Sequence, residues 1–167
     1  NKFYSLNNFI DIKNTNFVGY NFVSYKSKIK KIIVDGKFVN LLKHECKCIL
    51  ILDISPFYFE SGGQVGDKGF LIGNNFLFFI DNVKNVDGFY IHCGFLKFGY
   101  LRIGDYIKSC VDFDFRKKCS INHSSTHLIN YVLKQVLSNN IKQVGSYIDD
   151  FKLRFDFSYN CSLNSDI

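Results

Sequence analysis

The sequence predicts an α+β protein in which a small β-barrel comes first and a helix with a β-hairpin follows. Short apolar or alternating runs separated by turn signals fill residues 14–115, and the apolar period becomes that of a helix after Arg116. Residues 1–13 show neither pattern and are expected to form a lead-in segment. We therefore divide the chain into residues 1–13, 14–115 and 116–167.

Six or seven short strands are expected in residues 14–115, with no helix between them. Asp35-Gly36 stands between two apolar runs, which is typical of a tight hairpin, and Asp87-Gly88 is a further turn signal. Strands this short and closely spaced indicate a small closed or half-closed barrel. The expected strands are residues 17–25, 29–34, 48–54, 69–72, 76–83, 89–93 and 106–113.

A helix is expected at residues 122–137, with Asn122 as its N-cap and Asn139-Asn140 as its stop. At 100° per residue its apolar side chains cover one broad arc, which we expect to face a core. A hairpin of residues 142–148 and 152–159 follows. One helix and one hairpin cannot bury their own apolar faces, so this second part is expected to be cut short. The apolar arc consists of Leu128, Ile129, Val132, Leu133, Val136 and Leu137.

The composition is unusual, with 19 Phe, one Pro and no Met or Trp, and the printed sequence contains no Ala. No rule of folding excludes Ala, which is the best helix former. We therefore expect the bias to come from an AT-rich genome, such as that of a symbiont, a parasite or an organelle. A chain that lacks Met and begins at Asn1 is expected to be an internal fragment.

The net charge of +6 is compatible with a nucleic-acid partner. The densest basic patch is Lys26, Lys28, Lys30 and Lys31, for which a solvated strand is an equally good interpretation. The six cysteines form no CxxC pair and lie mostly in strand-like runs, so reduced thiols in a cytoplasmic protein are favoured over disulfides. No run approaches 18 apolar residues, so no membrane-spanning helix is expected.

His123 and His127 are four residues apart on the expected helix, so both imidazoles leave the same face. Two nitrogens placed in this way can reach one Zn²⁺ at roughly 2.0–2.1 Å each. The alternative is an incidental pair on a solvated face, and two ligands are only half of a zinc site. Ser124 stands where an HExxH metalloprotease has its Glu, so no general base is built into the motif.

A glycine-rich loop follows the strand that ends near Pro56. Gly62 and Gly63 let the backbone approach a ligand and expose amide groups, and Gln64 adds a neutral donor and acceptor. The alternative is a barrel corner that needs glycine for its bend. The loop is not a P-loop, because no GxxxxGK[ST] pattern or following helix is present.

Four segments together resemble the alanyl-tRNA synthetase family. They are the loop at residues 56–69 (Pro-Phe-Tyr-Phe-Glu-Ser-Gly-Gly-Gln-Val-Gly-Asp-Lys-Gly), residues 122–128 (Asn-His-Ser-Ser-Thr-His-Leu), and the pair at residues 142–146 and 153–159. Residues 17–20 match the segment that enters this region of the family. The motifs stand in family order from about Asn14 to the end of the chain.

The resemblance implies the editing region, a β-barrel followed by a zinc-dependent editing domain that hydrolyses mischarged Ser-tRNA(Ala) or Gly-tRNA(Ala). By the same resemblance, His123 and His127 are two zinc ligands, and Gln64 is the catalytic residue assigned to the editing pocket. Substrate or tRNA binding is assigned to Gly62, Gly63, Thr126 and Arg154, the last for a phosphate near the tRNA 3′ end.

The family's other zinc ligands, a Cys and a His in a Cys-Gly-Gly-Thr-His stretch, are expected beyond residue 167. The aminoacylation domain, which uses ATP and Mg²⁺ to attach alanine to tRNA(Ala), is expected upstream. We therefore expect this chain alone to be inactive and to bind zinc weakly. A free-standing editing deacylase and a non-catalytic RNA-binding barrel are the alternatives.

Overall fold

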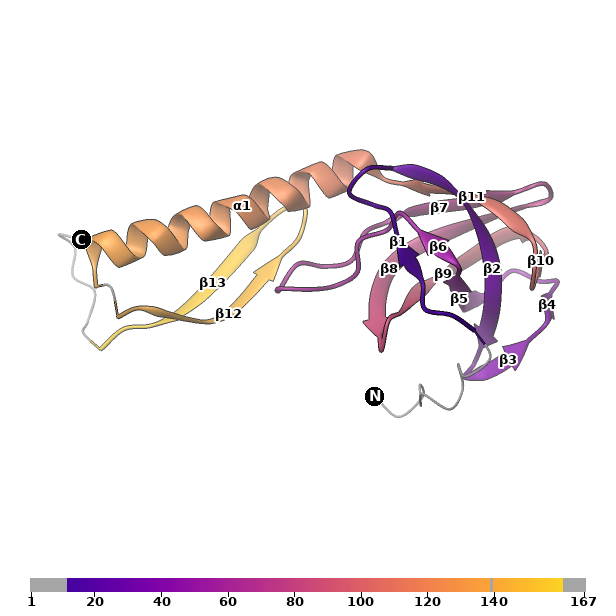
Figure 1. Cartoon of the computed structure of the whole chain (residues 1–167), viewed down its shortest axis with the longest axis horizontal. Coiled ribbons are helices and arrows are strands. Elements are labelled where there is room, and N and C mark those ends of the chain that lie inside the picture. Colours follow the sequence, from indigo (N-terminus) through magenta and orange to yellow (C-terminus); the bar gives the residue numbers. More distant parts are fainter. Residues whose placement is uncertain (1–11, 139, 161–167) are drawn as a thin grey trace. The chain divides into compact units, whose positions relative to one another are not determined.

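The computed structural model describes residues 12–138 and 140–160, which fall into two compact units (Figure 1). The barrel unit comprises residues 12–60 and 66–113. The helix–hairpin unit comprises residues 61–65 and 114–160, so the glycine-rich segment belongs with the C-terminal part of the chain. The predictions for residues 1–11, Asn139 and Cys161, and for residues 162–167, lie outside the described residues.

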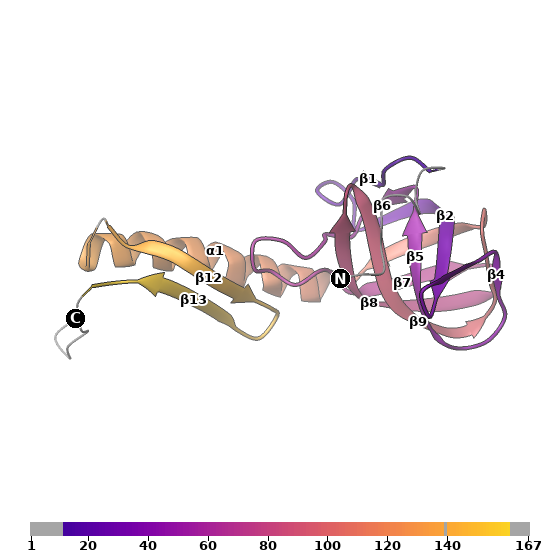
Figure 2. The same cartoon turned by 90° about the horizontal axis from the view of Figure 1, so that it is seen from below.

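Six antiparallel strands close the barrel. Figure 2 shows the barrel from below. Their hydrogen-bonded order is β11-β7-β8-β9-β5-β2, and β11 pairs with β2 to complete the ring. The small barrel predicted from the sequence is therefore confirmed. The six strands are β2 (Ser24–Val34), β5 (Lys47–Leu52), β7 (Gly69–Gly73), β8 (Phe76–Val86), β9 (Phe89–Gly99) and β11 (Tyr106–Val111).

Five shorter strands complete the barrel unit. β3 (Lys37–Val39) continues from β2 through a two-residue hairpin at Asp35-Gly36, where both residues have positive φ. This backbone is that of a type I′ turn, so the expected hairpin is confirmed. The other short strands form two pairs, β1 (Asn16–Phe17) with β6 (Ile54–Ser55), and β4 (Leu41–Leu42) with β10 (Leu101–Arg102).

The strand expected at residues 17–25 is wrong, because the chain turns within it. The amides of Asn21 and Phe22 donate to the carbonyl of Val18 at 3.2 and 3.1 Å, which ends β1 and delays β2 until Ser24. From there β2 runs without interruption to Val34, so two expected runs share one long strand. Glycine at position 19 lets the backbone of this turn pass close to the Phe17 ring, since a Cβ there would lie 2.4 Å from that ring.

The barrel interior is filled by apolar side chains that alternate along the strands. Several have no exposed surface at all, and large aromatic and branched residues dominate the set. Burying such side chains is the main favourable contribution to folding a closed barrel. The fully buried members include Ile29, Ile32, Leu50, Leu52, Phe57, Leu71, Phe78, Leu96 and Leu101.

One histidine is buried among these apolar residues. His92 Nδ1 donates to the carbonyl of Leu50 at 3.1 Å, and its Nε2 accepts from the Ser55 hydroxyl at 2.8 Å. Both ring nitrogens are therefore satisfied by the neutral form. Burial lowers the pKa of His92 to about 4. His92 is therefore a structural residue of the barrel core.

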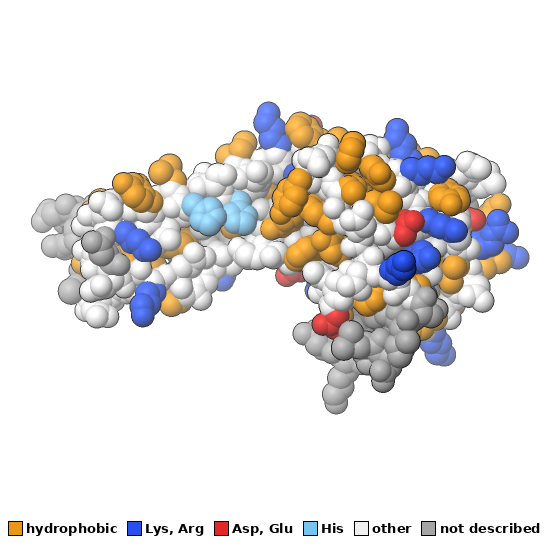
Figure 3. Space-filling model, viewed as in Figure 1, with side chains coloured by type: hydrophobic (Ala, Val, Ile, Leu, Met, Phe, Trp, Pro, Cys, Tyr) orange, Lys and Arg blue, Asp and Glu red, His pale blue; other side chains and the backbone are white. Residues whose placement is uncertain are grey.

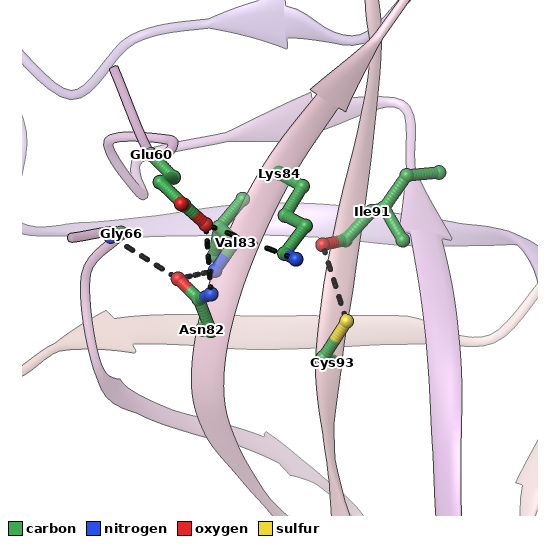
Figure 4. A network of polar contacts seen from close by, with 7 residues as sticks. All are labelled: Glu60, Gly66, Asn82, Val83, Lys84, Ile91 and Cys93. Atoms are coloured by element: carbon green, nitrogen blue, oxygen red, sulfur yellow. Dashed lines mark hydrogen bonds and ion pairs between the residues drawn. The ribbon is translucent and has the colours of Figure 1, made fainter. Parts of the chain in front are cut away.

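A polar network on β8 fixes the backbone on both sides of the glycine-rich segment (Figure 4). Asn82 sits at a bulge in β8, where its Oδ1 accepts from the amide of Gly66 at 3.1 Å and its Nδ2 donates to Glu60 Oε2 at 3.2 Å. Glu60 also donates its amide to Val83 O at 2.8 Å and lies 3.9 Å from the Lys84 ammonium. A Cβ at Gly66 would lie 2.6 Å from Val83 N, so glycine allows this close approach.

The helix–hairpin unit contains α1 (Phe113–Val136), β12 (Lys142–Ile148) and β13 (Leu153–Ser158). The hairpin is confirmed, whereas the predicted helix start at Asn122 is wrong by nine residues. The first turns carry Phe115 and Cys119, which are four residues apart and both buried. The polar residues between Phe115 and Cys119 hide the helical period in the sequence.

The apolar arc of α1 does not face a core within the described residues. Leu128 and Val136 of this arc are 63% and 58% exposed, and Val144 and Phe151 of the hairpin region are also exposed. The buried side chains of the helix are Phe115, Cys119 and Thr126. Within residues 12–138 and 140–160, no helix is long and apolar enough to cross a membrane.

Candidate functional site

The glycine-rich segment lies against the end of β12, where Gln64 and Ile148 form an isolated parallel β-bridge. Val65 donates its amide to Ile148 O at 3.0 Å, and Ile148 donates to Gly63 O at 2.8 Å. The Ser146 hydroxyl adds a hydrogen bond to Gly62 O at 3.2 Å. Three hydrogen bonds between residues more than 80 positions apart therefore determine where the tip of the loop lies.

The two central glycines of the loop serve different purposes. Both have positive φ, +60° at Gly62 and +83° at Gly63, a region that other residues rarely adopt. A Cβ at Gly63 would also lie 2.6 Å from the Ser146 carbonyl oxygen, whereas one at Gly62 would make an ordinary contact of 3.6 Å with the His123 ring. Gly63 is thus needed for close packing, and Gly62 for its backbone conformation.

Gln64 follows these glycines, and its side chain is buried. Its side chain is 6% exposed, and its Oε1 lies 2.8 Å from His123 Nδ1. Since Oε1 can only accept, the imidazole donates from Nδ1, and in the neutral ring the lone pair is at Nε2. The loop and the helix therefore bring together two residues that the sequence analysis assigned to one site.

The two histidines of α1 lie together, as their spacing predicts. Their ring centroids are 5.2 Å apart with an angle of 25° between the rings, and His127 is exposed while His123 is half-buried. Figure 3 shows pale blue histidine side chains at the surface. Burial, together with the neighbouring His127, lowers the pKa of His123 and so favours its neutral form.

The residues at this site can supply part of a zinc site. Two nitrogens that bind one Zn²⁺ at about 2.0–2.1 Å each lie no more than about 4 Å apart. The two imidazole rings, with centroids 5.2 Å apart, are close enough for one nitrogen of each to meet this limit. A hydrogen bond from the other ring nitrogen to an oxygen acceptor is the usual support of a metal-binding histidine. His123 has this support from Gln64. The part of the chain that the structure describes holds no cluster of three or more potential metal-binding residues.

Thr126 and Arg154, the other expected binding residues, each contact a neighbour on their own element. Thr126 is 3% exposed, and its hydroxyl donates to Asn122 O at 3.0 Å, one helical turn back. Arg154 is exposed on β13, where its Nε lies 3.1 Å from a carboxylate oxygen of Asp156. Their assigned roles in substrate or tRNA binding remain predictions.

Two residues that support the site carry no role in the sequence analysis. Ser146 and Ile148 hold the loop through the hydrogen bonds described above, and Ser146 belongs to the 142–146 motif that marked the family resemblance. Asn122, expected to cap the helix, instead donates from Nδ2 to Asp149 O at 2.8 Å. The 142–146 motif was the available signal, but only the strand register shows what it contacts.

Comparison with known families matches the chain to a family of tRNA synthetases. The family described as tRNA synthetases class II (A) matches residues 2–115, about two thirds of the sequence. The matched region contains the whole barrel unit and the glycine-rich loop, and ends in the first turn of α1.

Proposed function

The chain belongs to the alanyl-tRNA synthetase family, the class II (A) tRNA synthetases, and from this premise we propose that residues 61–65 and 114–160 form part of a site that edits mischarged tRNA. Members of this family are ligases whose substrate is tRNA. The proposed reaction is hydrolysis of the ester that links serine or glycine to tRNA(Ala). The observation that carries the proposal is the hydrogen bond between Gln64 and His123.

Editing is needed because a binding pocket discriminates only weakly between amino acids of similar size. A pocket that accepts alanine also accepts glycine, because one missing methyl group changes the binding free energy by only about 1–3 kcal/mol. Serine adds one hydroxyl, which an apolar pocket also rejects weakly. A second, hydrolytic site removes the errors that the first site makes.

His123 and His127 would hold a zinc ion, with the remaining ligands supplied by residues outside the described chain. The bound ion would polarise the ester carbonyl or lower the pKa of a water molecule. Gln64 accepts the hydrogen bond from His123 Nδ1–H, which leaves the lone pair of Nε2 available to bind a metal ion. We assign Gln64 this positioning role in addition to its place in the editing pocket.

The glycine-rich backbone would bind the substrate close to this pair. Gly62 and Gly63 are exposed, and a Cβ at Gly62 would lie near the His123 ring, so a ligand beside His123 meets bare backbone there. Arg154 and Thr126 are retained as candidates for contact with the tRNA end. Attachment of alanine to tRNA(Ala) with ATP and Mg²⁺ would belong to an aminoacylation domain outside this chain.

The proposal is tested by deacylation of Ser-tRNA(Ala) with a protein that continues this chain through the expected Cys and His ligands. His123→Ala should lower hydrolysis by about 10–100-fold or more, since loss of even a residue that supports a metal ligand costs about 10–100-fold. His44→Ala is the matched control, since His44 is an exposed barrel residue. Zinc content measured on the same proteins should fall only for His123→Ala.

Other outcomes would favour the alternatives. Equal hydrolysis by both variants would contradict the proposed zinc site, and no hydrolysis by any of the proteins would favour a non-catalytic RNA-binding barrel. A start codon just upstream of Asn1 would favour the free-standing deacylase. The family match over residues 2–115 supports the synthetase.

A further inference from the structure

A groove of about 880 Å³ opens on the barrel unit, away from any residue assigned above. Strands β2 and β11 form one wall, and the turn between β7 and β8 lies at the other side. Its lining is rich in cationic, aromatic and amide side chains, which include Tyr25, Lys26, Asn75, Tyr100, Tyr106 and Lys108. Neither the closure of the barrel nor the proposed editing site accounts for this lining.

The register of β2 and β11 places three lysines around one tyrosine. Tyr106 is opposite Lys28 and Lys108 is opposite Lys26, so all four side chains share the outer face of the sheet. The ammonium groups of Lys26 and Lys28 lie 4.7 and 5.2 Å from the centroid of the Tyr106 ring. One exposed aromatic ring thus holds two like charges side by side.

No ion pair among the described residues neutralises these charges. In the described part of the chain, Lys26, Lys28 and Lys108 form no ion pair within 4 Å. Asp105 is the acidic residue of the groove lining, and it pairs with Arg102 at 3.3 Å. The like charges repel one another in the free protein, and a polyanion in the groove would relieve that repulsion.

We propose that this groove binds the phosphate backbone of tRNA. Lys26, Lys28 and Lys108 contact phosphates, and Tyr106 is a positioning residue that holds two of the ammonium groups in place. A polynucleotide is favoured over other polyanions because the same groove offers aromatic rings and the amide of Asn75 to bases and ribose. The inference rests on tRNA as the substrate in the proposed function, and it needs neither zinc nor hydrolysis.

The test measures binding of uncharged tRNA(Ala) to the 167-residue chain by fluorescence anisotropy, in the presence of EDTA. The groove variant replaces Lys26, Lys28 and Lys108 with Gln. The control variant replaces Lys37, Lys43 and Lys47 with Gln, which are exposed residues of the same barrel unit and change the net charge equally. Circular dichroism establishes that each variant is folded.

The groove variant should bind at least about 10-fold more weakly, and the slope of log affinity against log salt should fall by about 2–3, since each lost phosphate contact lowers it by about 0.7–0.9. The control variant should keep the slope of the unchanged chain. Tyr106→Leu should weaken binding several-fold without changing the slope, because it removes no charge.

Three results would overturn the proposal: no measurable binding by the unchanged chain, equal losses in the two lysine variants, or an unchanged slope in the groove variant. Because the RNA is uncharged and EDTA is present, none of these results depends on editing. Failure of the editing proposal would likewise leave this measurement unaffected.

Discussion

The barrel unit and the helix–hairpin unit both have a periodic apolar face, but only the barrel unit buries it among the described residues. In the barrel, six strands close on themselves and side chains such as Phe78 and Leu50 have no exposed surface. In the helix–hairpin unit, Leu128 and Val136 lie on an apolar arc that remains largely exposed within the described residues. The period of a sequence thus identifies an apolar face, but a partner must be present before that face contributes to stability.

The largest expected effect separates the two apolar sets. Phe78→Ala should lower the free energy of unfolding by about 3–5 kcal/mol, because it empties a fully buried site. Leu128→Ala should change it by less than about 0.5 kcal/mol, because that side chain is 63% exposed. Urea unfolding of both variants measures the difference. A large loss for Leu128→Ala would show that the arc is covered in solution.

The next effect concerns the buried histidine of the barrel. The pKa of His92 is about 4 in the folded chain and about 6.5 when unfolded, so the unfolded state binds the extra proton between these values. Stability should therefore fall as the pH decreases from about 6.5 towards 4, by up to about 3 kcal/mol. Urea unfolding between pH 7 and 5 measures the slope.

Two variants identify the source of that slope. His92→Gln should flatten it, whereas His44→Ala should keep it, because His44 is exposed. A slope that survives in His92→Gln would assign the acid sensitivity to other groups.

A smaller effect distinguishes the two loop glycines. Gly62→Ala and Gly63→Ala both carry the strain of a positive φ, of roughly 1–2 kcal/mol. Gly63→Ala should in addition detach the loop from β12, because its Cβ would meet the Ser146 backbone. Amide hydrogen exchange at Val65 and Ile148 should become faster in Gly63→Ala than in Gly62→Ala. Equal exchange in the two variants would contradict the packing role of Gly63.

The smallest effect tests the link between the helix and the hairpin turn. Asn122→Ala removes the hydrogen bond to Asp149 O and should lower the free energy of unfolding of this unit by about 1 kcal/mol. Ser124→Ala, at an exposed position of the same helix, is the control and should have little effect. Thermal unfolding of both variants compares them, and equal midpoints would assign no role to the Asn122 contact.

The sequence was sufficient wherever the decisive interactions are local. Asp35-Gly36 predicts a hairpin and Asp87-Gly88 a turn, and the structure has positive φ at all four residues. The spacing of His123 and His127 likewise predicts that the imidazoles lie together, as they do in the structure.

Contacts between distant residues were not accessible in the same way. The start of α1 depends on the burial of Phe115 and Cys119, which the sequence does not reveal. The contact between Gln64 and His123 joins residues 59 positions apart and depends on the register of the loop against β12. The lysines around Tyr106 similarly need the pairing of β2 with β11.

We propose that Gln64 holds the proton of His123 on Nδ1 and so leaves Nε2 available to zinc. The most direct test is nitrogen-15 NMR of the histidine side chains near pH 7.5, with and without Zn²⁺. His123 should carry its proton on Nδ1, and zinc should shift its Nε2 resonance and that of His127, but not His44. Gln64→Leu should abolish the preference for Nδ1–H. A proton on Nε2 of His123, or a zinc response equal at His44, would contradict the proposed site.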